Sequence, residues 1–166
     1  AFLDAEEVGM HGARAVFNHY NNWLEDINIV INVESRGHTG PVYLFETSEN
    51  NSKMIDFYKN AGFPYTFSAS SEVYGMMPNN TDLTIFIDNG FNCLNLATLD
   101  DLEYYHTEND NYSNIDKDSV ASYCNTLLPL LDEYTSNSKY SKLDYFDSSS
   151  NSVFFTVFPN VLVSYT

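Results

Sequence analysis

Two spacings of apolar residues alternate along the chain, one typical of helices and one typical of strands. The apolar pair Phe2 and Leu3 predicts the end of a buried strand, and an acidic stretch follows it. Residues 8–26 are predicted to be helical, because apolar side chains recur at helical spacing at Val8, Ala13, Val16, Phe17 and Tyr20. Residues 27–34 are rich in β-branched side chains and nearly continuous in apolar character, which predicts a central strand covered on both faces.

The alternation continues to residue 136. Strands are predicted at residues 42–47 and 93–99, and helices at residues 51–62, 68–77, 82–90 and 117–136. Gly62 is expected to close the first of these helices, Asp118 or Ser119 to cap the last, and Pro129 to kink it. This order predicts an α/β domain with helices on both faces of a sheet, whose ligand sites gather at the carboxyl ends of the strands.

The composition changes after residue 137. Residues 138–166 hold a polar linker rich in Ser and Asn, followed by an apolar run that Pro159 interrupts. The run is shorter than the roughly 20 residues that cross a bilayer. We therefore expect a domain over residues 1–137 and a tail that is either an edge strand or the start of a membrane segment continuing beyond the C-terminus.

Composition and charge narrow the classes of function. Apolar residues make up 43% of the 166 and aromatic residues 16%, which is too much apolar material for a disordered chain. With 7 basic and 23 acidic side chains, the formal charge of -16 repels phosphate backbones, so nucleic acid is not an expected partner. An acidic surface attracts cations or the amino end of a peptide, or it serves only solubility. The two cysteines, Cys93 and Cys124, are expected to be buried free thiols or a disulfide.

Three glutamates stand where a ligand site is expected. Glu6 and Glu7 are adjacent at a predicted helix start and point in different directions, so one can bind a metal while the other faces a water. Such acidic pairs also occur simply because the helix dipole stabilises them. Glu34 ends an apolar strand, where a carboxylate needs a partner or a cation, and an ion pair with Arg36 is the alternative.

Two further side chains have the chemistry of a metal site. His106 lies in a polar loop before a helix, where a neutral imidazole is either a zinc ligand or part of the surface. Asp82 is either the cap of a short helix or a carboxylate that orients a metal ligand.

The order of the motifs is more specific than any one of them. Along the chain come DAEEVGMHGAR, NVESRG, PNNTD and YYHTEND. This order and spacing resemble the M28 metallopeptidases over about residues 1–135, and most of all the membrane-associated or secreted branch, which carries NxExRG, a GP-LFETS strand, an EVY-PNDTD segment and YHTxxD. The resemblance implies a three-layer α/β/α fold with a mostly parallel mixed central sheet, its N-terminal half incomplete in this chain.

The resemblance also assigns roles to residues. It makes Glu6 the general acid and base, Glu7 and His106 ligands of one zinc ion, and Glu34 a ligand of a second. Residues expected to support these ligands or to contact the substrate are Asp4, Arg36, Asp82, Tyr105 and Asp110. The family's first histidine ligand and bridging aspartate would precede Ala1. Because a catalytic zinc usually has three protein ligands, the isolated chain is expected to bind zinc poorly.

The resemblance implies a zinc-dependent aminopeptidase, which hydrolyses the N-terminal peptide bond of a peptide substrate. The attacking water would be activated between two zinc ions. The isolated fragment is expected to be inactive. Two alternatives stay open: a catalytically inactive ectodomain for binding or anchoring, and acyl transfer of the kind that glutaminyl cyclases perform. The family further implies an extracytoplasmic setting, whether secreted, periplasmic, vacuolar or membrane-tethered, with any membrane association arising beyond the C-terminus. Three glycosylation sequons, at Asn50, Asn79 and Asn111, are compatible with a eukaryotic secretory route.

Overall fold

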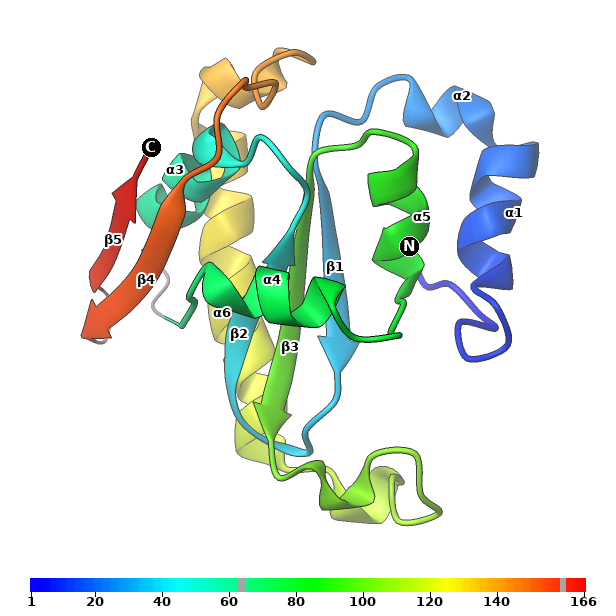
Figure 1. Ribbon diagram of the computed structural model, residues 1–166. Coiled ribbons are helices and arrows are strands. Elements are labelled where there is room, and N and C mark those ends of the chain that lie inside the picture. The colour runs from blue at the N-terminus through cyan, green and yellow to red at the C-terminus, as the bar shows by residue number, and fades with distance from the viewer. Residues whose placement is uncertain (63–64, 159–160) are drawn as a thin grey trace.

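The computed structural model describes residues 1–62, 65–158 and 161–166. The main sheet has the strand order β1-β3-β2 (Figure 1). Its strands are β1 (Val30–Ser35), β2 (Thr39–Thr47) and β3 (Cys93–Asp100). β1 runs parallel to β3, and β2 runs antiparallel to it. The predicted α/β fold with a mixed sheet is confirmed, but β1 is an edge strand with partly exposed residues, and the fully covered central strand is β3.

Helices cover both faces of the sheet because β3 is apolar on both sides. Leu94 and Leu96 point to one face and pack in the largest core cluster with side chains of α3 (Ser52–Asn60) and α6 (Lys117–Ser136). Cys93 and Ala97 point to the other face. There they pack against residues of α1 (His11–His19), α4 (Ala69–Gly75) and α5 (Asp82–Asp88). Figure 1 shows α6 behind the sheet and α4 and α5 in front of it, which gives three layers.

The N-terminal segment does not form the strand predicted from Phe2 and Leu3. Residues 1–5 have no regular structure, Phe2 is fully exposed, and only Leu3 packs against the cluster of α1 and α5. A strand needs a neighbour for its backbone N–H and C=O groups, and within the described ranges no strand pairs with this segment. The prediction of a strand is therefore wrong here.

The helix predicted over residues 8–26 is shorter and divided. α1 begins only at His11, and α2 (Asn21–Leu24) follows as a separate helix. The backbone is left-handed at Ala5, Gly9 and Met10, with φ of 62°, 113° and 57°, and a right-handed helix cannot pass through these residues. The two adjacent glutamates therefore lie in a turn ahead of α1, outside its first helical turn.

Two helix caps differ from the predicted ones. Thr81, and not Asp82, caps α5 through a capping box in which its hydroxyl accepts a hydrogen bond from Leu83 N at 3.2 Å. At the start of α6 the cap is Asp116, whose carboxylate accepts from Asp118 N at 3.1 Å. Asp82 becomes the first residue of α5, so its carboxylate is not used in capping.

The C-terminal residues form a hairpin of β4 (Val153–Phe158) and β5 (Val161–Tyr165). Phe154 and Leu162 are buried in the core cluster of α3 and α6, and Phe155 bridges to Phe67. Pro159 lies outside the described residues. No helix in the described part of the chain has the length and apolar character to cross a membrane, and Cys93 and the exposed Cys124 are not joined in a disulfide.

The loop between β1 and β2 lies directly against the end of β3. The N–H groups of Arg36 and Gly37 both donate to the Thr98 carbonyl, at 3.2 and 2.8 Å. A Cβ atom at Gly37 would lie 2.1 Å from the carbonyl oxygen of Asp100, far inside van der Waals contact. Only glycine allows this approach.

Replacing Gly37 by alanine is therefore expected to lower the free energy of unfolding by about 2 kcal/mol or more, because the backbone of β3 cannot move aside in a close-packed sheet. Gly75→Ala is the matched control, since no heavy atom lies within 4 Å of its added Cβ and a change within about 0.5 kcal/mol is usual there. Urea unfolding followed by circular dichroism measures both. Equal effects of the two substitutions would contradict the steric argument.

Candidate functional site

An acidic cavity of about 210 Å³ lies at the carboxyl end of β1. Four segments far apart in the sequence meet there: the turn before α1, the end of β1, the stretch between α4 and α5, and the loop after β3. The residues lining the cavity are Glu6, Glu7, Glu34, Ser35, Arg36, Tyr74, Pro78, Asn79, Asn80, Thr81, Tyr105 and His106. All four residues predicted to carry the catalytic and metal-binding roles are among them.

The turn that carries the two adjacent glutamates is fixed by its own backbone. The carbonyl of Glu6 accepts hydrogen bonds from Gly9 N and Met10 N at 3.0 and 2.9 Å. Asp4 does not line the cavity; its carboxylate accepts from Ala5 N at 2.7 Å, and its carbonyl accepts from Gly12 N at 2.9 Å. Asp4 therefore shapes the turn that presents Glu6.

Glu7 and His106 meet although 99 residues separate them in the chain. His106 Nε2 lies 2.8 Å from a carboxylate oxygen of Glu7, and both side chains are more than half exposed. His106 adopts a left-handed backbone with φ of 57°, and its ring stacks on Tyr105 with the ring centroids 3.9 Å apart. The loop after β3 is thus bent so that the imidazole faces the turn before α1.

Burial and nearby negative charges raise the pKa values of two of these glutamates. Burial raises the pKa of Glu34 to about 7, and the negative charges of Glu6 and Asp82 add to this, while Arg36 opposes it. The pKa of Glu6 is also raised, first by burial and then by the charges of Glu7 and Asp82. These directions indicate that the cavity holds more negative charge than its own cations balance.

Buried polar atoms around the cavity lack partners as well. Within the described residues, Arg36 Nε, Asn79 Nδ2 and Asp82 Oδ1 are buried without a hydrogen bond. Such atoms are uncommon in proteins and are usually satisfied by water or a ligand. The ion pair between Glu34 and Arg36 that the sequence allowed is not among the ion pairs of the described residues.

The donor atoms suit zinc in kind but are few in number. Carboxylate oxygens and an imidazole nitrogen are common zinc ligands, and the excess of negative charge favours a cation. Among the described residues, however, no group of three His, Cys, Asp or Glu side chains is arranged so that it could hold a metal ion. Glu7 and His106 by themselves are a pair of donors, and Glu34 is separate from them.

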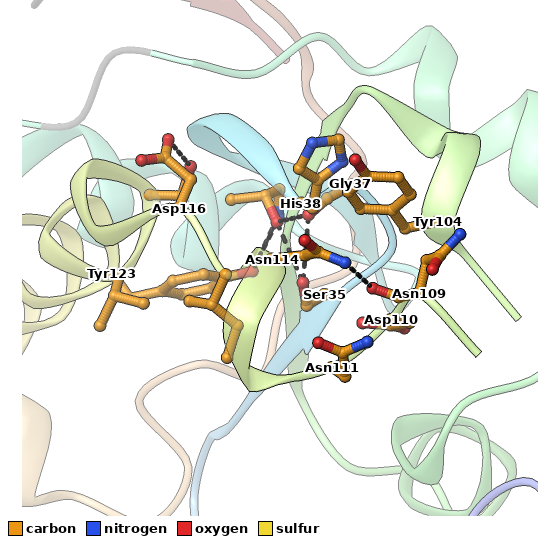
Figure 2. A pocket seen from close by; sticks show the side chains of 14 residues that line it. Ser35, Gly37, His38, Tyr104, Asn109, Asp110, Asn111, Asn114, Asp116 and Tyr123 are labelled. Atoms are coloured by element: carbon orange, nitrogen blue, oxygen red, sulfur yellow. Dashed lines mark hydrogen bonds between the residues drawn. The ribbon is translucent and has the colours of Figure 1, made fainter. Parts of the chain in front are cut away.

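Asp110 is a predicted site residue that does not line the acidic cavity. It lines a second cavity of about 200 Å³ together with His38 and Tyr104, whose rings stack with their centroids 4.3 Å apart. Figure 2 shows Asp110 there between Asn109 and Asn111, in the loop before α6. Ser35 contributes to both cavities. Asp82 does not line the first cavity, but its charge acts on both Glu6 and Glu34.

Sequence reasoning did not assign a role to Tyr74 or to Asn79, although both line the acidic cavity. Tyr74 is buried against Phe45, and burial followed by the charges of Glu46 and Glu34 raises the pKa of its phenol. The only signal in the sequence was that both residues belong to the EVY and PNNTD stretches shared with the family.

The fold and the cavity together define a class: α/β proteins that gather carboxylates and an imidazole at strand ends. Within that class the chain belongs to peptidase family M28, whose family model matches residues 1–131. No solved structure matches the chain.

Curated relatives agree with this family. The chain is 32% identical over 93% of its length to the vacuolar membrane protease of Candida glabrata, and 30% identical over 72% to that of Meyerozyma guilliermondii. It is also 29% identical over 99% of its length to endoplasmic reticulum metallopeptidase 1 of Mus musculus. It spans only 16%, 12% and 18% of these three relatives, respectively.

The raised pKa of Glu34 predicts how stability depends on pH in metal-free buffer. Between its ordinary value of 4.5 and about 7, the folded chain binds a proton that the unfolded chain releases, so Glu34 makes the chain less stable as pH rises through this window. Glu34→Gln should therefore gain stability relative to the parent, on the order of 2 kcal/mol, between pH 4.5 and 8. Urea unfolding with a chelator present measures this difference.

Glu108→Gln is the matched control, because Glu108 is exposed on the loop after β3. Its stability relative to the parent should change little over the same pH range. A Glu34→Gln difference that is constant with pH would contradict a raised pKa at Glu34.

Proposed function

We propose that this chain carries the catalytic glutamate and part of the ligand set of a zinc-dependent aminopeptidase. The observation that carries the proposal is the contact of Glu7 with His106 at 2.8 Å beside Glu6, which brings together three residues with roles in the family pattern. The remaining ligands would come from residues outside these 166. Membership of family M28 and relatives named as proteases and a metallopeptidase support the class of reaction.

Glu7, His106 and Glu34 would hold the metal, Glu7 and His106 sharing one ion and Glu34 belonging to a second. Zinc bound there would act as a Lewis acid that makes a water molecule more acidic and polarises the carbonyl under attack. Glu6 accepts the proton from the attacking water and gives it to the departing amine when the C–N bond breaks. The raised pKa of Glu6 brings this carboxylate closer to the pH at which both transfers are favourable.

The negative charge of the cavity favours the amino end of a peptide over its middle. The glutamates attract a free amino terminus and not an anionic polymer such as nucleic acid. This charge supports exopeptidase action at the amino end.

The relatives also bear on location. They are named for the vacuolar membrane and the endoplasmic reticulum, so we infer that the domain lies outside the cytosol.

A catalytically inactive binding domain is the second candidate. The observation in its favour is that no three potential ligands come together among the described residues. The two candidates differ in whether the natural gene product binds zinc and hydrolyses peptides.

Glu6→Gln in the zinc-loaded gene product is expected to lower kcat by about 10²–10⁴-fold, because general acid–base catalysis contributes about this much. Its zinc content should stay at the level of the parent, since Glu6 is not a ligand in the proposal. Hydrolysis of alanyl p-nitroanilide and metal analysis measure the two quantities, with the exposed Glu49→Gln as control. Full turnover by Glu6→Gln would refute the role of Glu6. A parent that binds no zinc and hydrolyses no peptide would refute the catalytic proposal and leave the binding domain.

The isolated chain of 166 residues should retain well under one zinc ion after dialysis, because the described residues provide no group of three ligands. The gene product should lose zinc on His106→Ala, whereas His19→Ala on α1 should not affect it. Stoichiometric zinc in the isolated chain would show that the ligand set is complete within it.

A further inference from the structure

Arg36 is the only lysine or arginine among the described residues that line the acidic cavity. In a cavity with three glutamates, a guanidinium is expected to form an ion pair with one of them. Within the described ranges, however, no carboxylate lies within 4.0 Å of a nitrogen of Arg36, and its Nε is buried without a hydrogen-bond partner. Within the described structure the guanidinium therefore has no anionic partner.

Contacts nevertheless fix both the backbone and the guanidinium of Arg36. Its backbone N–H donates to the Thr98 carbonyl at 3.2 Å, and the tight packing of Gly37 against Asp100 fixes the next residue. At the other end, the guanidinium carbon lies 5.1 Å from the centroid of the Tyr105 ring, within the range of a cation–π interaction. A side chain held in this way loses little conformational freedom when it binds, which favours affinity.

A planar guanidinium recognises a carboxylate with two parallel hydrogen bonds, and no other side-chain cation does so. Cations bound by the neighbouring glutamates would reduce the repulsion between these glutamates and a substrate carboxylate. Arg36 lines the same cavity as Glu6, so a carboxylate bound to Arg36 lies close to the residue whose peptide bond is cut.

We propose that Arg36 binds a carboxylate of the peptide substrate, so that the site prefers short peptides that carry a carboxylate one or two residues after the scissile bond. This inference rests on the proposed peptidase function and deepens it. The carboxylate is either the C-terminus of a dipeptide or an acidic side chain, and substrate pairs separate these two sources.

The test compares kcat/KM of the zinc-loaded gene product on alanyl-alanine and its amide, and on alanyl-glutamate amide and alanyl-glutamine amide. The parent should prefer the charged member of one pair by about 10- to 100-fold, mainly in KM, as expected for a hydrogen bond between charged groups. The pair that shows the preference identifies the source. Arg36→Met should bring that ratio close to one, and Arg36→Lys should keep part of it.

The ratio separates recognition from a structural role, because a distorted cavity would slow both members of a pair equally. Lys53→Met is the matched control: Lys53 also rests on a tyrosine ring, 5.7 Å from the centroid of Tyr145, but lies away from the cavity. It should leave the ratio unchanged. A parent with no preference in either pair, or a preference that survives Arg36→Met, overturns the inference.

Calorimetric binding of the same dipeptides to Glu6→Gln, with and without Arg36→Met, distinguishes the two proposals. If the parent gene product shows no turnover, carboxylate-dependent binding would leave the role of Arg36 standing and refute the peptidase. Turnover without any carboxylate dependence in binding or kinetics would do the reverse.

Discussion

The candidate site depends on the contact between the loop after β1 and the carboxyl end of β3. The Thr98 carbonyl accepts two N–H groups of this loop, and the Thr98 hydroxyl donates to the Gly37 carbonyl at 2.6 Å. The Tyr123 hydroxyl of α6 donates to the Glu34 carbonyl and accepts from Thr98 N at 2.9 Å. Glu34 and the residues after it are thus fixed to the central strand, whose own continuation brings His106 back to the cavity. A shift of this contact would move Glu34, Arg36 and His106 together.

That rigid frame carries an arrangement of charges that is unfavourable by itself. Three glutamates share one cavity, the pKa values of two of them are raised, and Asp82 has a buried oxygen without a partner in the described structure. Residues that only stabilise a fold are rarely arranged in this way, whereas perturbed pKa values cluster at functional sites. The repulsion among these carboxylates is consistent with membership of a peptidase family, because a cation bound in the cavity would remove it.

The site shows where the sequence was sufficient and where it was not. Its motifs selected Glu6, Glu7, Glu34 and His106, and all four line one cavity. The helix start expected at the glutamates was wrong, because left-handed residues before His11 replace the first helical turn with an irregular one. Asp110 and Tyr105 stand five residues apart in the same loop, yet they line different cavities.

By itself, the sequence determined the order of strands and helices between residues 27 and 136 and the identity of the ionisable residues at their ends. Both follow from local properties, since the spacing of apolar side chains reflects burial within one helical turn or one strand. Only the tertiary structure decided that β3 is the central strand, that Glu7 meets His106 across 99 residues, and that Arg36 rests on Tyr105 without an ion pair. These contacts join segments far apart in the chain, and their distances depend on how the turns, loops and layers pack, which no local pattern of residues specifies.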